Sequence, residues 1–191
     1  MAVFVKLLPG SPKRAELLVN DEPVKLVSCS IVSLPDLRSL PEEHVQERLQ
    51  ELEVKGGIRY ALSHLSRQSV HSKALQKALR RHCLEPVVVA KIIAYCVRQG
   101  LLDDEDWIAR HVEQWQTKGK SPRAIAAFLR SKGISAEVQP DEQVALRAVI
   151  ERHFPQLLAS DLPYPERARI LRSLQRRGFS LSSVQRFLAD R

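Results

Sequence analysis

Cysteine is scarce in this 191-residue chain, and its placement argues against two kinds of site. Cys29, Cys83 and Cys96 lie far apart, and no C-x-x-C pair occurs. Neither a disulfide framework nor a thiolate metal site is expected from such spacing. Isolated thiols fit a reducing compartment, so the sequence predicts a cytoplasmic protein.

Long hydrophobic runs are also lacking. Residues 1–8 are mostly apolar, but Pro9, Gly10 and Pro12 end this run before it reaches the length of a signal-peptide core. No later segment approaches the roughly 20 apolar residues that cross a bilayer. We therefore expect no membrane partner.

Aromatic residues make up only 5% of the chain, whereas hydrophobic residues as a whole make up 44%. A core must then be built from Leu, Val, Ile and Ala, which is the mixture expected of packed helices. A β-sandwich would need more aromatic residues and more threonine. The composition therefore predicts a mostly α fold.

Recognised catalytic motifs are missing. The chain has no phosphate-binding Gly-rich loop and no G-x-S-x-G segment. His111 and Glu113 form an H-x-E pair, but the P-C-x-x-C motif of the zinc deaminases is absent. The acidic cluster 103–106 precedes an apolar helical pattern, which favours helix capping over metal binding. We expect no enzyme activity, no cofactor and no small-molecule substrate. A metal-dependent hydrolase or nuclease, with the acidic cluster holding the metal, is kept as an alternative hypothesis.

Positive charge is concentrated in the later part of the chain. Residues 1–55 carry 7 basic and 9 acidic side chains, whereas residues 56–191 carry 23 and 13, and the formal net charge is +8. Such an excess favours a polyanion or an acidic protein groove as the partner. The alternative is a solvated surface that only keeps the protein dissolved.

Residues 1–38 are expected to form a short β-hairpin or three-stranded meander. Apolar runs at 3–8, 15–19 and 24–27 are separated by segments rich in Gly, Pro, Asn and Asp, which favour turns. Strands this short need a neighbour to pack against. We expect this small sheet to cap the helical part.

An acidic connector helix is expected over residues 39–56. Ser39-Leu40-Pro41-Glu42 combines a capping hydroxyl, an early Pro and a Glu three residues after the Ser. Apolar residues at helical spacing follow. Gly56-Gly57 is expected to break this helix.

An internal repeat is the most informative feature of the sequence. Each copy has two apolar residues four positions apart, then cations, then a Gly-type position and an apolar residue. The Gly-type positions are Cys83, Gly133 and Gly178. They predict three helical repeats, each of about three short helices, over residues 57–102, 103–160 and 161–191.

The repeat pattern has a physical basis at the helix ends. Gly can adopt the left-handed conformation that ends a helix, and cations in the last turn oppose the negative end of the helix dipole. Cys83 adopts this conformation less readily, so the first copy should end less cleanly. In the second copy, Ser121-Pro122 predicts a helix start, and a last helix is expected from Asp141. Stacked repeats predict an elongated, curved body.

Two tryptophans in the second repeat, Trp107 and Trp115, have alternative interpretations. Exposed indoles could stack on nucleic-acid bases. Their spacing on an amphipathic helix favours packing between helices instead. We therefore expect them in the core.

Basic residues recur at equivalent positions of the three repeats, with few acidic residues beside them. Within each helix, their spacing keeps them on one side. The alternative is that these are ordinary solvated helix faces. The recurrence favours a partner-binding surface, for which we predict Lys73, Lys77, Arg80, Arg81, Lys118, Lys120, Arg123, Arg130, Lys132, Arg172, Arg176 and Arg177, with Arg169 beside the third group.

Three segments of the second repeat together form a specific pattern. They are Leu101 to Ala109, with acids before an aromatic residue, Lys118 to Ile125, with Lys-Gly before a Pro-Arg helix start, and Leu129 to Ile134, a basic turn ending in Gly. This pattern resembles the RecX family of regulatory proteins. The resemblance extends from about residue 57 to the C-terminus, with a weaker echo in the N-terminal part.

The sequence departs from the RecX pattern at three positions. Cys83 stands in place of the expected Gly, Pro140 lies within the second repeat, and Trp107 replaces another aromatic residue. We expect these departures to leave the fold unchanged and to affect the exact contacts that the protein makes with its partner.

The resemblance implies three tandem three-helix repeats and an inhibitory, stoichiometric activity. RecX-like proteins bind within the groove of a RecA filament on single-stranded DNA, suppress ATP hydrolysis and strand exchange, and so modulate homologous recombination and DNA repair. We therefore expect the RecA filament as the partner, single-stranded DNA contacted directly or through the filament, and a monomer. A free-standing helix-turn-helix-like DNA-binding protein is the alternative.

Overall fold

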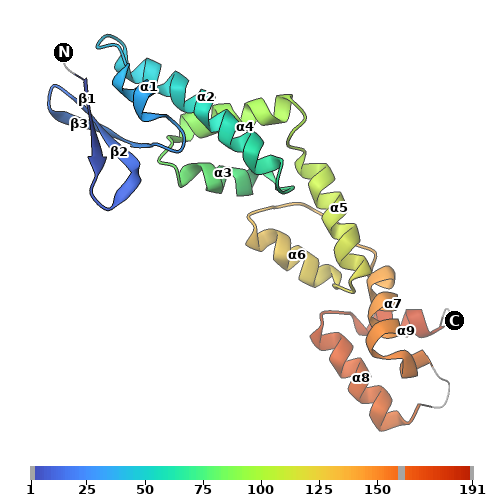
Figure 1. Ribbon diagram of the computed structural model, residues 1–191. Helices are drawn as coiled ribbons and strands as arrows, with labels where there is room; N and C mark the ends of the chain where they lie inside the picture. Colours follow the sequence, from blue (N-terminus) through green and yellow to red (C-terminus); the bar gives the residue numbers. More distant parts are fainter. Residues whose placement is uncertain (1–2, 159–161, 190–191) are drawn as a thin grey trace. The chain divides into compact units, whose positions relative to one another are not determined.

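The structure is a computed structural model that describes residues 3–158 and 162–189 (Figure 1). The chain divides into two compact units, Met1–Asp104 (unit 1) and Glu105–Arg191 (unit 2). It is mostly helical and has a three-stranded antiparallel sheet at the start of unit 1, as predicted. Within the described ranges, no helix has the length and apolar character needed to span a bilayer.

The sheet of unit 1 is a meander. Strands β1 (Val3–Leu8), β2 (Ser11–Val19) and β3 (Glu22–Ser28) pair antiparallel in the order β1-β2-β3. β2 and β3 begin earlier than expected because each connecting turn is only two residues long. Asn20 and Asp21, with φ of 53° and 64°, form a turn whose twist suits a hairpin.

One face of the sheet packs against the helices of unit 1. Ala15 and Leu17 of β2 and Val27 of β3 are almost fully buried, whereas Phe4 of β1 is 52% exposed. Side chains alternate between the two faces of a strand, so only one face can join the core. The sheet therefore caps the helical part, as the sequence predicted.

The expected helix start at Ser39 was wrong. Ser39 is instead the C-cap of the short helix α1 (Leu34–Arg38), and the next helix, α2 (Val45–Leu65), begins after His44. The pattern Ser-Leu-Pro-acid occurs twice in this region, and only the first copy, at Ser33, begins a helix. There the Asp36 N–H donates to Ser33 Oγ at 3.3 Å. A local capping pattern alone could not distinguish the two copies.

The expected break at Gly56-Gly57 was also wrong, because α2 runs through both glycines. A Cβ on Gly56 would lie 1.9 Å from Ile31 O, and a Cβ on Gly57 would lie 2.3 Å from Ile92 Cδ1. The glycines therefore allow α2 to approach two neighbouring segments closely. Of the acidic connector expected over residues 39–56, residues 45–56 form the first half of α2, and residues 39–44 are not helical.

Two further helices complete unit 1: α3 (Ser72–Arg80) and α4 (Pro86–Arg98). α4 packs against both α2 and α3 (Figure 1). The Asp104 carboxylate accepts hydrogen bonds from Ser72 N at 2.7 Å and Ser72 Oγ at 2.5 Å. The last residue of unit 1 therefore caps the N-terminus of α3.

A buried ion pair joins the sheet to the helices. Lys25 Nζ of β3 lies 2.8 Å from Glu53 Oε2 of α2 and 2.7 Å from Glu85 Oε1, just before α4. Glu53 is 1% exposed, and burial raises its pKa even though Lys25 counteracts the shift. Burial lowers the pKa of Lys25, but hydrogen bonds to Glu53 and Glu85 outweigh this effect and leave that pKa raised.

Unit 2 begins with α5 (Asp104–Thr117), whose first residue belongs to unit 1, and α6 (Pro122–Ser131). Their core contains Trp107, Ile125 and Leu129. The segment 134–140 is not helical, and its alternate residues Ile134, Ala136 and Val138 pack on this core. An extended segment therefore follows α6 in this core, before the helix that the sequence predicted from Asp141.

The remaining elements share a second core. They are α7 (Glu142–His153), the 3-10 helix η1 (Pro155–Leu158), α8 (Tyr164–Arg176) and α9 (Leu181–Ala189). The sequence assigned the helix from Asp141 to the second repeat, but its buried residues pack with those of α8 and α9. Pro140 ends the extended segment, and Asp141 Oδ1 accepts from Gln143 N at 2.8 Å and so caps α7.

Left-handed residues end the short helices. Gly133, with φ of 76°, donates its N–H to Arg130 O at 2.9 Å, and the next N–H donates to Leu129 O at 3.0 Å. Gly178 ends α8 with the same pair of bonds. Cys83 is also left-handed, with φ of 60°, but within the described ranges only the first of these two bonds is present, from the Cys83 N–H to Arg80 O at 3.3 Å. The first copy therefore ends less cleanly, as predicted.

We predict that Lys25→Met lowers the free energy of unfolding by about 3 kcal/mol at pH 7, because it leaves the Glu53 carboxylate buried and unpaired. The raised pKa of Glu53 means that protonation below neutral pH relieves this cost, so the loss should shrink between pH 7 and pH 5. Urea unfolding followed by circular dichroism measures both effects. Glu85→Gln, at a 56% exposed partner, is the control and should cost less than about 1 kcal/mol. A loss that does not change with pH would contradict the assignment.

We also predict that Gly133→Ala destabilises the protein by about 1 kcal/mol, although nothing lies within 4 Å of the added Cβ. The cost comes from the left-handed backbone alone. Thermal unfolding of Gly133→Ala and of the reciprocal variant Cys83→Gly tests this, and the second variant should be no less stable than the original protein. Equal destabilisation by both changes would show that backbone conformation is not the cause.

Candidate functional site

All twelve predicted cations are exposed. None of them forms an ion pair with a residue of the described ranges 3–158 and 162–189. Ion pairs are instead made by other basic residues, such as Arg48 with Glu51 and Arg110 with Asp106. The predicted cations are therefore available for an anionic partner.

The first group lies on α3 and just beyond its end. Lys73, Lys77, Arg80 and Arg81 are exposed, whereas Leu75 and Leu79 of the same helix are fully buried. The apolar spacing of four fixes the inner face, so the cations occupy the outer face. Residues 56–104, which contain this group, carry 8 basic and only 3 acidic side chains.

His82 follows this first group but does not add to its charge. Burial lowers its pKa, and the nearby Arg14 lowers it further. Its Nδ1 lies 3.1 Å from Ser28 Oγ, and its ring packs edge-on against Tyr60 at 4.5 Å between centroids. The imidazole is therefore part of the packing between α3 and the sheet.

The second group surrounds α6. Lys118 and Lys120 lie in the loop before the helix, and Arg123, Arg130 and Lys132 lie on or just after it. The loop is held by Ser121, which is 1% exposed and whose Oγ accepts from Ala124 N at 3.3 Å. The helix start, and with it the spacing of these cations, is therefore fixed by a side-chain cap.

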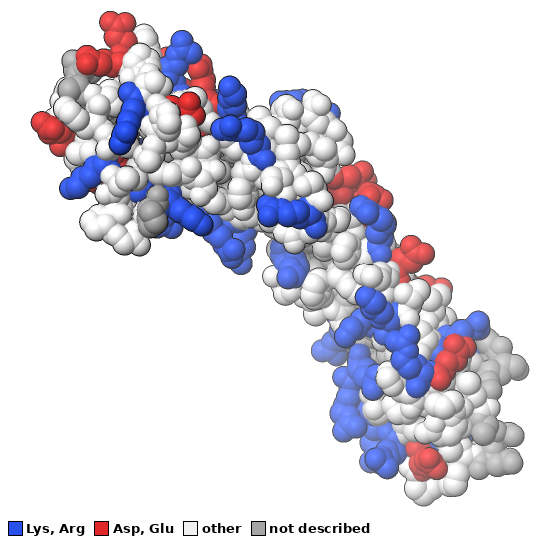
Figure 2. All heavy atoms as spheres, in the orientation of Figure 1, with Lys and Arg blue, Asp and Glu red and all other residues white. Residues whose placement is uncertain are grey.

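The third group lies close to the second and consists of Arg172 and Arg176 of α8 and Arg177 just beyond its end. Ser121 Oγ donates to Arg177 O at 2.8 Å. A Cβ on Gly178 would lie 3.5 Å from Arg123 Cβ. The C-terminal end of α8 thus lies against the start of α6, and cations that are far apart in the sequence share one region of unit 2. Figure 2 shows Lys and Arg atoms along the left-hand flank of this unit, where α8 lies in Figure 1.

Two of these cations also pack on aromatic rings. Lys132 Nζ lies 5.1 Å from the centroid of Phe128, and Arg177 Cζ lies 5.5 Å from that of Phe154. The first pair is four residues apart on a helix and could have been found from the sequence. The second joins α8 to the end of α7 and has no local signal.

The tryptophans lie between helices, as predicted. Trp107 is 7% exposed and stacks on His111 at 3.8 Å between centroids, and Trp115 packs edge-on against Phe128 of α6 at 4.6 Å. His111 Nδ1 lies 2.7 Å from Trp107 O. The ring of His111 is therefore held by packing within unit 2.

The acidic cluster 103–106 has structural contacts. Asp104 caps α3, and Asp106 Oδ2 lies 2.7 Å from Arg110 Nη2. Capping was predicted, but for the helix that follows the cluster and not for α3. Within the described ranges, no group of three or more His, Cys, Asp or Glu side chains is placed to hold a metal ion.

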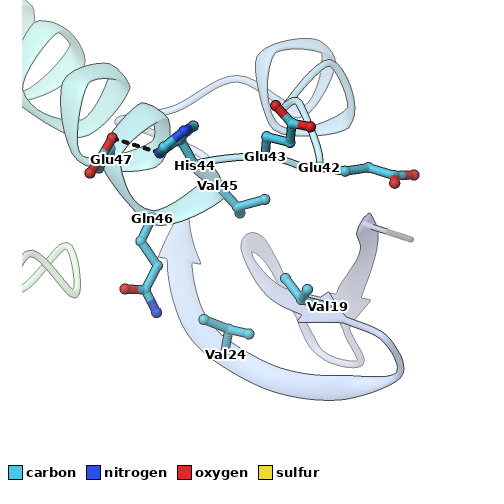
Figure 3. Close-up of a pocket in the computed structure, with 8 residues that line it drawn as sticks. All are labelled: Val19, Val24, Glu42, Glu43, His44, Val45, Gln46 and Glu47. Carbon is cyan, nitrogen blue, oxygen red and sulfur yellow. Dashed lines mark ion pairs between the residues drawn. The ribbon is translucent and has the colours of Figure 1, made fainter. Parts of the chain in front are cut away.

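A hollow of about 700 Å³ lies beside the sheet in unit 1 (Figure 3). Val19 and Val24 lie opposite Val45, and Glu42, Glu43 and the ion pair between His44 and Glu47 also line the hollow, on the side of Val45. These carboxylates would repel a phosphate group. The hollow is therefore separate in chemistry from the cationic groups.

Comparisons with known proteins agree on one family. A family model described as RecX, third three-helix domain, matches residues 141–188, which contain α7, α8 and α9. Regulatory protein RecX of Cronobacter sakazakii is 32% identical over 110 residues, which is 52% of this chain and 64% of that protein. Regulatory protein RecX of Serratia proteamaculans is 28% identical over 118 residues, 56% of this chain and 67% of that protein.

A crystal structure of a regulatory protein RecX superposes with a TM-score of 0.59 over 99% of this chain and 98% of the other, at 18% identity. This likeness shows a common fold. The sequence likeness to the Cronobacter protein spans just under two thirds of that relative. The domain match over residues 141–188 and the sequence relatives, on a fold that RecX proteins share, support a protein of the RecX family of regulatory proteins.

Proposed function

We propose that the protein binds RecA filaments on single-stranded DNA, lies in the filament groove, and inhibits ATP hydrolysis and strand exchange. In this way it modulates homologous recombination and DNA repair. The observation that carries the proposal is that twelve exposed cations recur on and beside the three helices α3, α6 and α8, with no ion pair in the described part of the chain. Unpaired positive charge of this kind is suited to acidic protein surface or to phosphates.

The proposed mechanism is stoichiometric binding without chemistry by this chain. Three tandem repeats would present their cations to successive RecA protomers, so that one bound monomer bridges several of them. A bridge resists the motions that accompany nucleotide turnover, because it binds one arrangement of the protomers better than the others. Inhibition then follows from binding energy alone and requires no cofactor.

The close approach of α6 and α8 bears on this proposal. Ser121 and Gly178 bring the ends of α6 and α8 together, so the second and third groups of cations can contact one partner surface at the same time. Multiple weak charge contacts held by one rigid body add their effects. The first group, on α3, would then engage a further part of the filament.

We predict that reversing one charge in each group, with Lys77→Glu, Arg130→Glu and Arg172→Glu combined, weakens inhibition of RecA ATPase activity about tenfold or more. The three side chains are exposed, so the free energy of unfolding should change by less than about 1 kcal/mol. A titration of the variant into RecA on single-stranded DNA measures the concentration at half inhibition.

The matched control combines Lys55→Glu, Arg147→Glu and Arg186→Glu, which are also exposed and change the net charge equally. The control should inhibit as the original protein does. Full inhibition by a folded first variant would reject the assignment of these residues. Equal loss in both variants would show that net charge alone is responsible.

Direct contact with DNA can be separated from contact through the filament. If single-stranded DNA is contacted directly, affinity should fall steeply with salt, and each lost phosphate contact should reduce the slope by about 0.7. Fluorescence anisotropy with a labelled oligonucleotide at several salt concentrations measures this slope for both charge-reversed variants. We expect weak binding without base preference. Tight, base-specific binding to duplex DNA would instead support the helix-turn-helix-like alternative.

A further inference from the structure

Helix α4 is apolar on two opposite faces. Its inner face, formed by Val88, Val89, Ile92 and Cys96, is fully buried in unit 1. Its outer face carries a second apolar series that is exposed: Val87, Ala90, Ala94 and Val97, extended by Leu101 just beyond the helix end. Val87 is 55% exposed, Val97 53% and Leu101 41%. A helix with two apolar faces is expected to bury both, but in the described part of the chain only the inner face of α4 is covered.

The outer series has the spacing of a helix-pairing surface. Within the helix, its members follow one another at steps of three, four and three residues, which is the a and d pattern of a coiled-coil seam, and Leu101 lies beyond the left-handed Gly100 that follows the helix. The two alanines lie at the middle, with valines at both ends. Small central side chains let the backbone of another helix approach closely and leave space for its bulky side chains.

The charges beside this apolar series indicate what kind of helix could pack on it. Lys91 and Arg98 are exposed and lie one heptad apart along one edge of the seam, and neither forms an ion pair within the described ranges. Lys91 Nζ donates to Gln50 Oε1 at 2.8 Å, which leaves its charge uncompensated. No acidic residue of α4 lies along the opposite edge.

A second copy of this chain is a poor match for this surface. An antiparallel pair of α4 helices would place Lys91 and Arg98 of one copy against the same residues of the other, and like charges repel. A parallel pair would place the cations against an edge without charge. A helix with an apolar stripe and carboxylates along its edge satisfies both the seam and the cations.

We propose that the outer face of α4 is a docking surface for an amphipathic helix with acidic flanks, supplied by a partner protein. The bulky apolar residues of that helix lie over Ala90 and Ala94, and its carboxylates pair with Lys91 and Arg98. This surface is separate from the twelve cations of the proposed filament contact and does not depend on that function.

The test uses the full chain and a fluorescein-labelled helical peptide of three heptads, with Leu at a and d and Glu at e and g. The protein should bind this peptide, and Ala94→Glu should weaken binding about tenfold or more, because it places a carboxylate in the apolar seam. A peptide with Lys in place of Glu should also bind at least about tenfold more weakly. Ala109→Glu, which adds the same charge at an exposed alanine of α5, should bind the first peptide as the original protein does.

Circular dichroism checks that each variant is folded, and Val97→Ser provides a milder change in case Ala94→Glu is not. Equal binding by the Ala94→Glu and Ala109→Glu variants would overturn the proposal, as would equal binding of the Glu and Lys peptides. Sedimentation of the protein alone tests the other possible occupant of this face, a second copy of the chain. A dimer that Ala94→Glu abolishes would assign the face to a second copy and overturn the proposal.

Discussion

The cationic surfaces depend on left-handed residues at the ends of short helices. Gly133 and Gly178 turn the chain directly after the last helical turn, which leaves the preceding cations in solvent and returns an apolar residue to the core. The same geometry satisfies carbonyl groups that would otherwise lack partners. Each helix therefore presents positive charge at its end for structural reasons, and a partner can use charge that the fold already places there.

Much of the helical fold could be predicted from local signals. The capping Ser121, the glycine ends and the apolar spacing of four residues all act within a few positions of the chain, and the structure confirms α6 and α8 where these signals lie. The three-stranded meander was predicted for the same reason. Exposure of the twelve cations also followed, because the buried side of an amphipathic helix fixes which side is in solvent.

The errors occurred where distant segments decide the outcome. Gly56 and Gly57 are typical of a helix break in the sequence, but Ile31 and Ile92 pack so closely that only glycine fits within α2. α7 was assigned to the wrong core, because its amphipathic pattern does not say which neighbour it meets. The cap that Asp104 provides for α3 joins residues 32 positions apart. Contacts of this range leave no signal in a short window of sequence.

The extended segment 134–140 gives unit 2 an uneven resistance to opening. Its backbone lacks the hydrogen-bond ladder of a helix, and in the described part of the chain its apolar packing on the core around Trp107 is made by Ile134, Ala136 and Val138. Regions with few buried apolar contacts open at the lowest free energy, without unfolding of the remaining structure. We expect this segment to exchange its amide hydrogens before the flanking helices do, so that the chain between α6 and α7 opens while the cation-bearing helices α6 and α8 stay folded.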